Sequence, residues 1–294
     1  MTIQTEPDTD GPRYLTTREA AELLRVKERK VYDLAAAEEI PHRRITGKLL
    51  FPRTELLAWI ESSGTASAAR PNVLGGSHDP LLDWAAAESG SGLATFFNGS
   101  RAGLDGFVAA RSVMTGLHIA EDDGWNIRAV QSLAPRDAVL IGWAMRRRGL
   151  MIAPGVGNLA DGIGALRGRR VVRRQDGAGA STLLAQLMAR NGINEHDVTL
   201  TASAARTESE AAAMLSEGTA DVALGLETSA RSYRLTFNGL LWERYDLLVD
   251  RRAYFTPGIQ ALIAFSQTET FAQKAAAMGG YDLSVLRQVQ WLSP

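Results

Sequence analysis

The 294-residue chain contains no cysteine, and this absence narrows the chemistry available to it. Disulfide bonds, thiolate metal ligands, a cysteine nucleophile and a lipid-modified cysteine anchor are all excluded. Histidine is scarce as well: none of the four histidines lies within helical spacing of another, so we expect no metal site. A chain of this length can bury a sizeable core without either form of cross-link.

Long apolar runs are also missing. No stretch approaches the roughly 18 uninterrupted apolar residues of a membrane-spanning helix, so we expect no membrane partner. The N-terminal segment MTIQTEPDTDGPRY is polar and acidic, which is unlike a signal peptide, and we expect a cytoplasmic protein. Hydrophobic residues make up 45% of the chain and charged residues 22%, as in ordinary globular proteins. The net charge of −1 argues neither for nor against a nucleic-acid partner.

Changes in composition divide the chain into four parts. Small and polar residues fill the segment SSGTASAAR, which is typical of a flexible linker. Beyond it, apolar strand-like runs alternate with helical runs rich in alanine and leucine, which favours an α/β domain with a largely parallel sheet. We therefore expect a disordered tail at residues 1–13, a small domain at 14–62, a linker at 63–71 and a large domain at 72–294.

The small domain carries the signals of a helical module with a hairpin. Thr16 and Glu19 form a capping-box pattern at the start of a first helix that ends near Arg25, and a second helix begins around Lys27. Two short helices separated by about three residues form a helix-turn-helix. The segment HRRITGKLLF then predicts a β-hairpin, and a third helix over residues 53–61 closes the core.

Basic and aromatic side chains gather on the second helix and the hairpin, where they can enter a major groove or contact phosphates. The candidates are Lys27, Arg29, Lys30, Tyr32, Arg43, Arg44 and Lys48. The pattern YLTTREAAELL…VYDL…LLFPRTELLAWI resembles the excisionase and MerR-type winged helix-turn-helix, which implies binding of double-stranded DNA. One such module covers too little surface for tight specific recognition, so we expect a homodimer on a palindromic site. A three-helix module for protein contacts is the alternative.

A glycine-rich connection in the large domain, VVRRQDGAGASTLLAQL, predicts a strand, a tight turn and the start of an amphipathic helix. Main-chain N–H groups at such a helix start can hold an anion. The turn has no lysine before Ser181 and Thr182, which argues against a nucleotide-binding Walker loop. The segment GVGNLA has dinucleotide-like spacing, but glycines interrupt the helix that should follow it. Two further segments, GGSHDPLLDWAAAE and FNGSRAGLDGFVAAR, repeat the pattern of strand, turn and helix.

These turns, together with the segments GTADVALGLE and ERYDLLVDR, resemble a type 2 periplasmic-binding-protein-like domain. The resemblance implies two lobes, one built from about 72–125 and 227–294 and the other from about 126–226, with a ligand in the cleft between them. The residues that would touch this ligand are Ser77, His78, Ser100, Arg101, Arg174, Gln175, Gly179, Ala180 and Ser181. Serines at such turns also cap helices, and Arg174 could pair with a carboxylate instead.

The combined fold class is α/β, with a small winged helix-turn-helix domain and a bilobed binding-protein-like domain. Such domains accompany some molybdopterin-synthesis proteins and regulators near molybdate transport genes, so the resemblance implies a one-component transcription regulator. Its small anionic effector would be molybdate, tungstate or a pterin-type compound related to the molybdenum cofactor. We find no catalytic constellation, and we expect neither an enzyme nor a bound cofactor. The alternatives are an enzyme or accessory protein of molybdenum cofactor metabolism with a targeting helix-turn-helix, and a transport binding protein, which the missing export signal disfavours.

Overall fold

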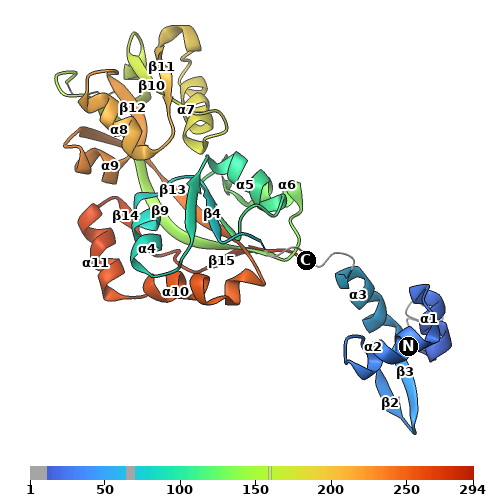
Figure 1. Cartoon of the computed structure of the whole chain (residues 1–294). Helices are drawn as coiled ribbons and strands as arrows, with labels where there is room; N and C mark the ends of the chain where they lie inside the picture. Colours follow the sequence, from blue (N-terminus) through green and yellow to red (C-terminus); the bar gives the residue numbers. More distant parts are fainter. Residues whose placement is uncertain (1–11, 64–69, 158, 160) are drawn as a thin grey trace, which may run out of the picture. The chain divides into compact units, whose positions relative to one another are not determined.

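The structure, a computed structural model, describes residues 12–63, 70–157, 159 and 161–294 and divides into two compact units. The units are Met1–Ala69 and Arg70–Pro294, whose helices and strands are drawn in Figure 1. Each unit has its own hydrophobic core. The expected tail at 1–13 and the expected linker at 63–71 lie largely outside the described residues. Within the described ranges, no helix is long and apolar enough to cross a membrane.

The small unit contains three helices and a three-stranded sheet within its described residues. Its elements are β1 (Tyr14–Leu15), α1 (Thr17–Leu24), α2 (Glu28–Ala36), β2 (Arg43–Ile45), β3 (Lys48–Pro52) and α3 (Arg53–Ser63). The sheet has the order β1-β3-β2, and all its neighbouring strands are antiparallel. The predicted helix-turn-helix, hairpin and closing helix are therefore confirmed, although α3 runs two residues further than expected.

Local chemistry explains the boundaries of these elements. The Thr16 hydroxyl accepts a hydrogen bond from the Glu19 amide at 3.3 Å, and the Glu19 carboxylate accepts one from the Thr16 amide at 2.7 Å, so the predicted capping box starts α1. Arg25 ends α1 in the left-handed conformation. The hairpin turns at Thr46 and Gly47, both at positive φ, which suits the twist of a two-residue connection.

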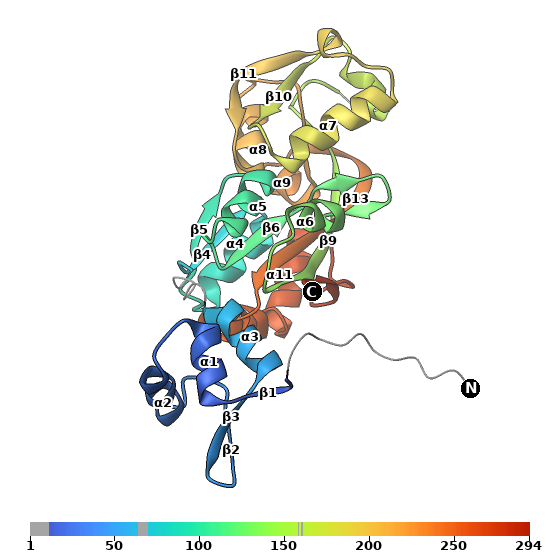
Figure 2. The same cartoon turned by 90° about the vertical axis from the view of Figure 1, so that its right-hand side faces the viewer.

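The large unit contains a long mixed sheet with helices on both faces (Figure 2). Its strands are β4 (Val73–Gly76), β5 (Ala94–Phe97), β6 (Met114–Leu117), β7 (Ala120–Glu121), β8 (Gly124–Trp125), β9 (Ala138–Ile152), β10 (Arg170–Arg174), β11 (Thr199–Ala205), β12 (Val222–Leu226), β13 (Thr236–Asp250), β14 (Tyr281–Asp282) and β15 (Val289–Leu292). Its helices are α4 (Pro80–Glu88), α5 (Ser100–Val108), α6 (Ile127–Leu133), α7 (Gly179–Arg190), α8 (Glu208–Ser216), α9 (Glu227–Ser232), α10 (Pro257–Phe265) and α11 (Glu269–Met278).

Two 15-residue strands, β9 and β13, join the two ends of this sheet. The main strand order is β11-β10-β12-β9-β13-β6-β4-β5, and β14 and β15 pair with β9. Strand pairs at both ends are parallel, whereas β9 and β13 are antiparallel to each other and to their neighbours β12 and β6. The sheet is therefore mixed and not largely parallel as expected, because two long antiparallel strands run through its centre. The pair β9–β13 therefore forms the hinge between the lobes.

The boundary between the lobes differs from the expected one. Val130 of α6 and Leu140 of β9 belong to the same core cluster as Phe107 and Leu248, which lie in lobe one. The second lobe has its own core around β10, β12, α7 and α8. The expected start of lobe two at about residue 126 is therefore wrong, because the apolar side of α6 packs onto lobe one before the chain leaves it along β9.

Arg70 also departs from the expected linker at 63–71. Its guanidinium pairs with Asp250 at 2.9 Å and donates to the main-chain carbonyl groups of Phe107 and Ser112. The same guanidinium lies over the Phe107 ring. Arg70 is therefore an anchored residue of the large unit, because its charge is satisfied there.

Candidate functional site

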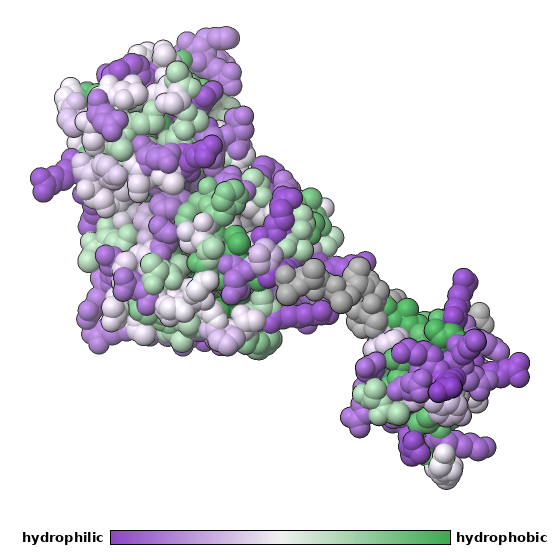
Figure 3. Space-filling model, in the orientation of Figure 1, coloured by the Kyte–Doolittle hydropathy of each residue, from purple (hydrophilic) through white to green (hydrophobic). Residues whose placement is uncertain are grey.

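All seven candidate DNA-contacting residues are exposed in the small unit. Four lie on α2 or at its N-cap and three on the hairpin: Lys27, Arg29, Lys30, Tyr32, Arg43, Arg44 and Lys48. Hydrophilic side chains cover much of the visible face of this unit (Figure 3). Arg43 is held by Glu55 of α3 at 2.8 Å, so α3 orients one arm of the hairpin.

A hollow of about 630 Å³ brings part of this set together between α1, α2 and the hairpin. Tyr32, Arg44 and Lys48 line it, and so does Arg18 of α1, which the sequence did not single out. Arg18 also pairs with Glu22 at 3.1 Å on the exposed side of α1. Three separate elements thus present donors at one hollow, an arrangement suited to contacts with a phosphate backbone.

In the large unit, two of the glycine turns meet across the cleft between the lobes. The amide of Arg101, in the first turn of α5, donates to the carbonyl of Gly177 at 3.3 Å. A β-carbon at Gly99 would lie 3.3 Å from the α-carbon of Ala178. Gly99 has a φ of +93°, a conformation that side chains other than glycine rarely adopt. The turn before α5 therefore touches the turn before α7 through main-chain atoms.

A second contact across the cleft joins Gly179, the first residue of α7, to His118. A β-carbon at Gly179 would lie 2.6 Å from the His118 carbonyl oxygen, so only glycine fits. On its other side, the His118 amide donates to the Ser100 hydroxyl at 3.2 Å. Ser100 and His118 are both buried. These two contacts join the lobes directly beside the hinge strands.

Behind the turns, the hinge strands carry a cluster of buried charges. Glu243 of β13 accepts hydrogen bonds from Arg146 through Oε1 and from Arg148 through both oxygens, at 2.6 and 2.8 Å. His118 Nδ1 lies 3.1 Å from Glu243 Oε2. Arg146 also lies over the Tyr245 ring, 4.1 Å from its centroid. Arg146, Arg148 and Glu243 are completely buried, which is rare for charged side chains unless they are paired.

The cluster reaches into both lobes. At one end, Arg146 Nη1 donates to Asp79, the N-cap of α4 in lobe one, at 3.0 Å. At the other end, Arg148 donates to Glu208 of α8 at 3.2 Å, and Arg174 of β10 donates to the same carboxylate at 3.0 Å. The ion pairs therefore run from lobe one, through the hinge, to lobe two.

Charge in the cluster is balanced, since three guanidinium groups face three carboxylates. Burial opposes the ionisation of Glu243, but Arg146 and Arg148 outweigh it and hold its pKa well below the usual value. Burial lowers the pKa of His118, and the two arginines reinforce this effect while Glu243 opposes it. The imidazole is therefore neutral at neutral pH, and the carboxylate is ionised.

Comparison with known families identifies both units. The sequence model of the PBP superfamily domain matches residues 83–267, which is more than half of the chain. The chain belongs to the PBP superfamily. A helix-turn-helix domain family matches residues 14–64, at the other end of the chain.

One curated protein and several solved structures are similar to the chain. The uncharacterized protein YvgK of Bacillus subtilis (strain 168) is 23% identical over 299 residues, which cover 93% of this chain and 96% of YvgK. Among solved structures, a protein described as a phosphate ABC transporter substrate-binding protein from Clostridium perfringens, with bound phosphate, has a TM-score of 0.50. It is 12% identical and covers 74% of this chain and 99% of its own. The effector-binding domain of QuiR with shikimate covers 69% and 96%, at 13% identity and a TM-score of 0.46.

The contact between the two lobes brings together several of the residues that the sequence proposed for ligand contact. Four of them lie at the contacts between the turns: Ser100, Arg101, Gln175 and Gly179. Ser77 is buried beside them, with its carbonyl accepting a hydrogen bond from Tyr245. Ala180 is buried in the first turn of α7. Arg174 pairs with a carboxylate, which is the alternative that the sequence left open for it.

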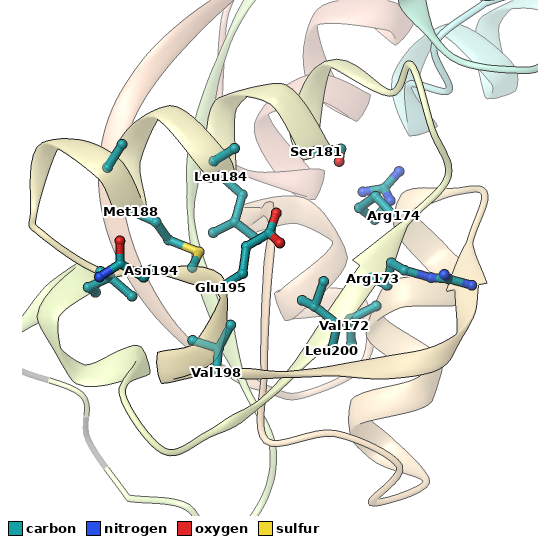
Figure 4. A pocket seen from close by; sticks show the side chains of 13 residues that line it. Val172, Arg173, Arg174, Ser181, Leu184, Met188, Asn194, Glu195, Val198 and Leu200 are labelled. Carbon is teal, nitrogen blue, oxygen red and sulfur yellow. The ribbon is translucent and has the colours of Figure 1, made fainter.

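His78 and Ser181 have other surroundings. The His78 ring packs edge-on against Phe97, with ring centroids 5.1 Å apart, and its Nε2 lies 3.7 Å from Asp83 of α4. Ser181 lines a pocket of about 300 Å³ between α7 and the strands β10 and β11 (Figure 4). Every residue that lines this pocket lies between 172 and 200, so it belongs to lobe two alone.

Sequence reasoning missed the buried hinge charges, above all Arg146, Arg148, Glu243 and Glu208. One signal was available, because the run MRRRG interrupts an otherwise apolar strand. Alternate residues of a strand share a face, so Arg146 and Arg148 point to the same side while Arg147 points to the other. The structure agrees, since Arg147 is far more exposed than its two neighbours.

Proposed function

We propose that this protein is a one-component transcription regulator that binds DNA with its small unit and a small anionic effector in the cleft of its large unit. The observation that carries the proposal is the pairing of an exposed basic helix-turn-helix with a PBP-superfamily domain whose hinge strand bears two buried arginines. A ligand that prefers one arrangement of the lobes shifts the population toward it, and DNA affinity can change with it.

We further propose that the regulator acts as a homodimer in the cytoplasm. A single winged module contacts only one half-site, so a dimer on a palindromic operator supplies the surface that specific binding needs. The three-helix alternative, a module for protein contacts, does not call for the exposed donors found at the hollow between α1, α2 and the hairpin.

The identity of the effector is the most specific part of the proposal. Molybdate, tungstate and a phosphorylated pterin-type compound follow from the sequence resemblance. A bare tetrahedral oxyanion needs only neutral N–H and O–H donors, whereas guanidinium groups suit phosphate groups with their planar, paired donors. Arg146 Nε and Arg148 Nη1, which have no hydrogen-bond partner among the described residues, therefore favour a phosphate-bearing effector over the metal oxyanions. The fold of the phosphate-bound Clostridium perfringens protein is compatible with this choice.

We propose that the cleft binds its effector without transforming it. A general acid or base works best with a pKa near the working pH. Arg148 and Arg174 hold the pKa of Glu208 below its usual value despite burial, and the pKa of Glu243 is held low by its arginines. Neither carboxylate is therefore suited to giving up a proton near neutral pH.

A binding screen on the full chain tests the proposal. Thermal unfolding is measured with phosphate, sulfate, molybdate, tungstate and phosphorylated pterins, because a ligand that binds only the folded state raises the melting temperature. DNA binding is then measured with and without the strongest stabiliser. We expect at least one anion to stabilise the large unit and to change the DNA affinity. Stabilisation by none of them would overturn the anionic effector, and unchanged DNA affinity would overturn the regulatory link.

A further inference from the structure

A hollow of about 470 Å³ lies in lobe one, between helix α5 and the strands β4 and β5. Its volume is within the range of small-molecule sites, about 300–1,000 Å³. Strand β5 is the last strand of the main sheet on this side, so the hollow lies at an edge of the sheet. Every residue that lines the hollow lies between 73 and 112, so lobe two contributes nothing to it.

Small residues keep this hollow open. Gly75 and Ala94 face it from the strands, and Ala102 and Gly106 face it from α5. A β-carbon at Gly75 would have its nearest neighbours at 3.8 Å, and one at Gly106 would have them at 3.9 Å, so both would fit. Neither glycine has a positive φ. Packing and backbone conformation therefore do not require glycine at these two positions, and its effect there is to leave space.

Two polar atoms at the hollow have no hydrogen-bond partner among the described residues. They are the hydroxyl oxygen of Ser112 and Oδ1 of Asn98, and both atoms are buried. Ser112 is only 4% exposed, and its hydroxyl oxygen lies 3.8 Å from the position of a β-carbon at Gly75, so it faces the floor of the hollow. Buried polar atoms are rarely left unpaired in folded proteins, which points to a ligand at this place.

One cation and one aromatic ring complete the lining. Arg111 is the charged residue of the lining, and no carboxylate lines the hollow. Its Nε and Nη2 atoms lie 3.9 Å from the position of a β-carbon at Gly106, so the guanidinium stands over α5. Phe96 of β5 also lines the hollow, and its side chain is 64% exposed. The hollow therefore offers a positive charge, an uncovered ring and two unused polar atoms.

We propose that this hollow is a second ligand site, separate from the cleft, for a small aromatic carboxylate that also carries an N–H or O–H donor. The carboxylate pairs with Arg111, the ring packs against Phe96, and the donor reaches Asn98 Oδ1. The Ser112 hydroxyl, which can donate as well as accept, adds a further hydrogen bond. The site goes beyond the proposed function, because lobe two takes no part in it.

Other classes of ligand match fewer of these groups. An inorganic anion would pair with Arg111 but would leave Phe96 and the apolar floor in contact with water. A neutral aromatic compound would cover Phe96 but would leave the guanidinium without a counter-charge. An aromatic carboxylate without a donor would bury Asn98 Oδ1 with its hydrogen-bonding need unmet, which costs free energy.

Calorimetric titration of the full chain at pH 7 with four related compounds tests the ligand class. The main probe is 4-aminobenzoate, which has the carboxylate, the ring and the donor. Benzoate lacks the donor, aniline lacks the carboxylate, and cyclohexanecarboxylate lacks the aromatic ring. We expect 4-aminobenzoate to bind most tightly, and aniline to bind roughly tenfold or more weakly because it loses the charge-assisted hydrogen bonds.

Two substitutions test the residues. Arg111→Gln should weaken the binding of 4-aminobenzoate by roughly tenfold or more, since it removes the charge. Ser112→Ala should weaken it by roughly two- to tenfold, the equivalent of one hydrogen bond. The same variant should keep or raise the melting temperature, because the lost hydroxyl has no partner in the described part of the protein. Arg136→Gln and Ser284→Ala, at exposed positions outside the hollow, are the matched controls.

Three outcomes would overturn the second site. The first is that the unaltered chain does not bind 4-aminobenzoate, or binds it no better than aniline. The second is that Arg111→Gln and Ser112→Ala bind it as tightly as the unaltered chain, since the ligand then lies elsewhere. The third is that Ser112→Ala lowers the melting temperature and keeps the affinity, which would make the hydroxyl structural. In each case the proposed function stands, because the residues of the hollow are not part of the cleft.

Discussion

Gly179 shows how a single β-carbon limits how closely the two lobes can approach. The residue lies against the His118 carbonyl and ring, and the site that a β-carbon would occupy is already filled. Main-chain atoms cannot move aside as a flexible side chain can, so the added methyl group must push the two lobes apart. The contact between the lobes therefore requires a glycine at position 179 because a side chain would not fit, and not because of the conformational freedom of its backbone.

The Gly179→Ala substitution should loosen the cleft and cost about 1–3 kcal/mol of stability, the usual range for overpacking. The Arg101 amide, which donates to Gly177 across the cleft, should lose protection against hydrogen exchange. Gly164→Ala is the control, because the nearest atom to its β-carbon would be 3.9 Å away. Equal protection of the Arg101 amide in both variants would contradict a steric role for Gly179.

Asp246 of β13 predicts a pH dependence of stability. Burial raises its pKa to about 6, although Arg244 and Asn126 oppose the shift. The folded state thus holds the proton more tightly than the unfolded chain, in which the pKa is near 3.8. The resulting stabilisation is complete below about pH 3.8 and is lost as the pH rises through 6, a change of about 3 kcal/mol.

Comparison with Asp246→Asn isolates this effect. The asparagine cannot titrate, so the stability of the unaltered protein relative to the variant should fall between pH 4 and pH 7. Chemical denaturation followed by tryptophan fluorescence at several pH values measures the difference. A difference that does not change with pH would show that Asp246 has an ordinary pKa.

At the scale of elements, α2 is the part of the small unit that should carry DNA affinity. Its exposed face presents Arg29 and Lys30. Val31, which lies between Lys30 and Tyr32 in the sequence, is buried in the core. Replacing Arg29 and Lys30 with alanine should weaken operator binding and lower the salt-dependence slope by roughly two, at about 0.9 for each phosphate contact. The variant Arg190→Ala removes an exposed charge from the large unit and serves as the control. If the unaltered protein, the double alanine variant and Arg190→Ala had the same slope in a salt titration, α2 would not be part of the DNA interface.

The elements also show how far the sequence could predict the structure. The Thr16–Glu19 capping box and the turn at Thr46 and Gly47 depend only on residues a few positions apart, and both were predicted correctly. The pairing of Arg146 with Glu243 depends on the register between β9 and β13, which joins residues 97 positions apart. No local pattern encodes that register, so the charge cluster at the hinge could be recognised only in the folded chain.

The ligand-contact residues divide in the same way. The turns containing Ser100 and Gly179 were found because glycine and serine before a helix form a local signal, and the structure places these turns in contact across the cleft. The surroundings of Ser181 were not predictable, since they depend on how β11 packs beside α7. Whether these residues touch a ligand stays a prediction.

At the scale of the whole molecule, the two units should be separable because each has a core of its own. A fragment of residues 70–294 should fold, keep its response to anions and lose DNA binding. A fragment of residues 71–294 should be less stable, because it lacks the Arg70 guanidinium that pairs with the Asp250 carboxylate. Thermal unfolding of the two fragments measures the difference. Equal melting temperatures would show that Arg70 contributes nothing to the large unit.

The central position of β13 in the sheet has a consequence for synthesis on the ribosome. Strands β4, β5 and β6 of lobe one connect to β9 only through β13, which emerges about a hundred residues after β9 begins. The intervening residues form most of lobe two, which is continuous in the chain and can fold as a unit while lobe one waits. Until β13 emerges, the apolar face of the nascent lobe one has no central strand to cover it. The first lobe to be translated is therefore the last to be completed.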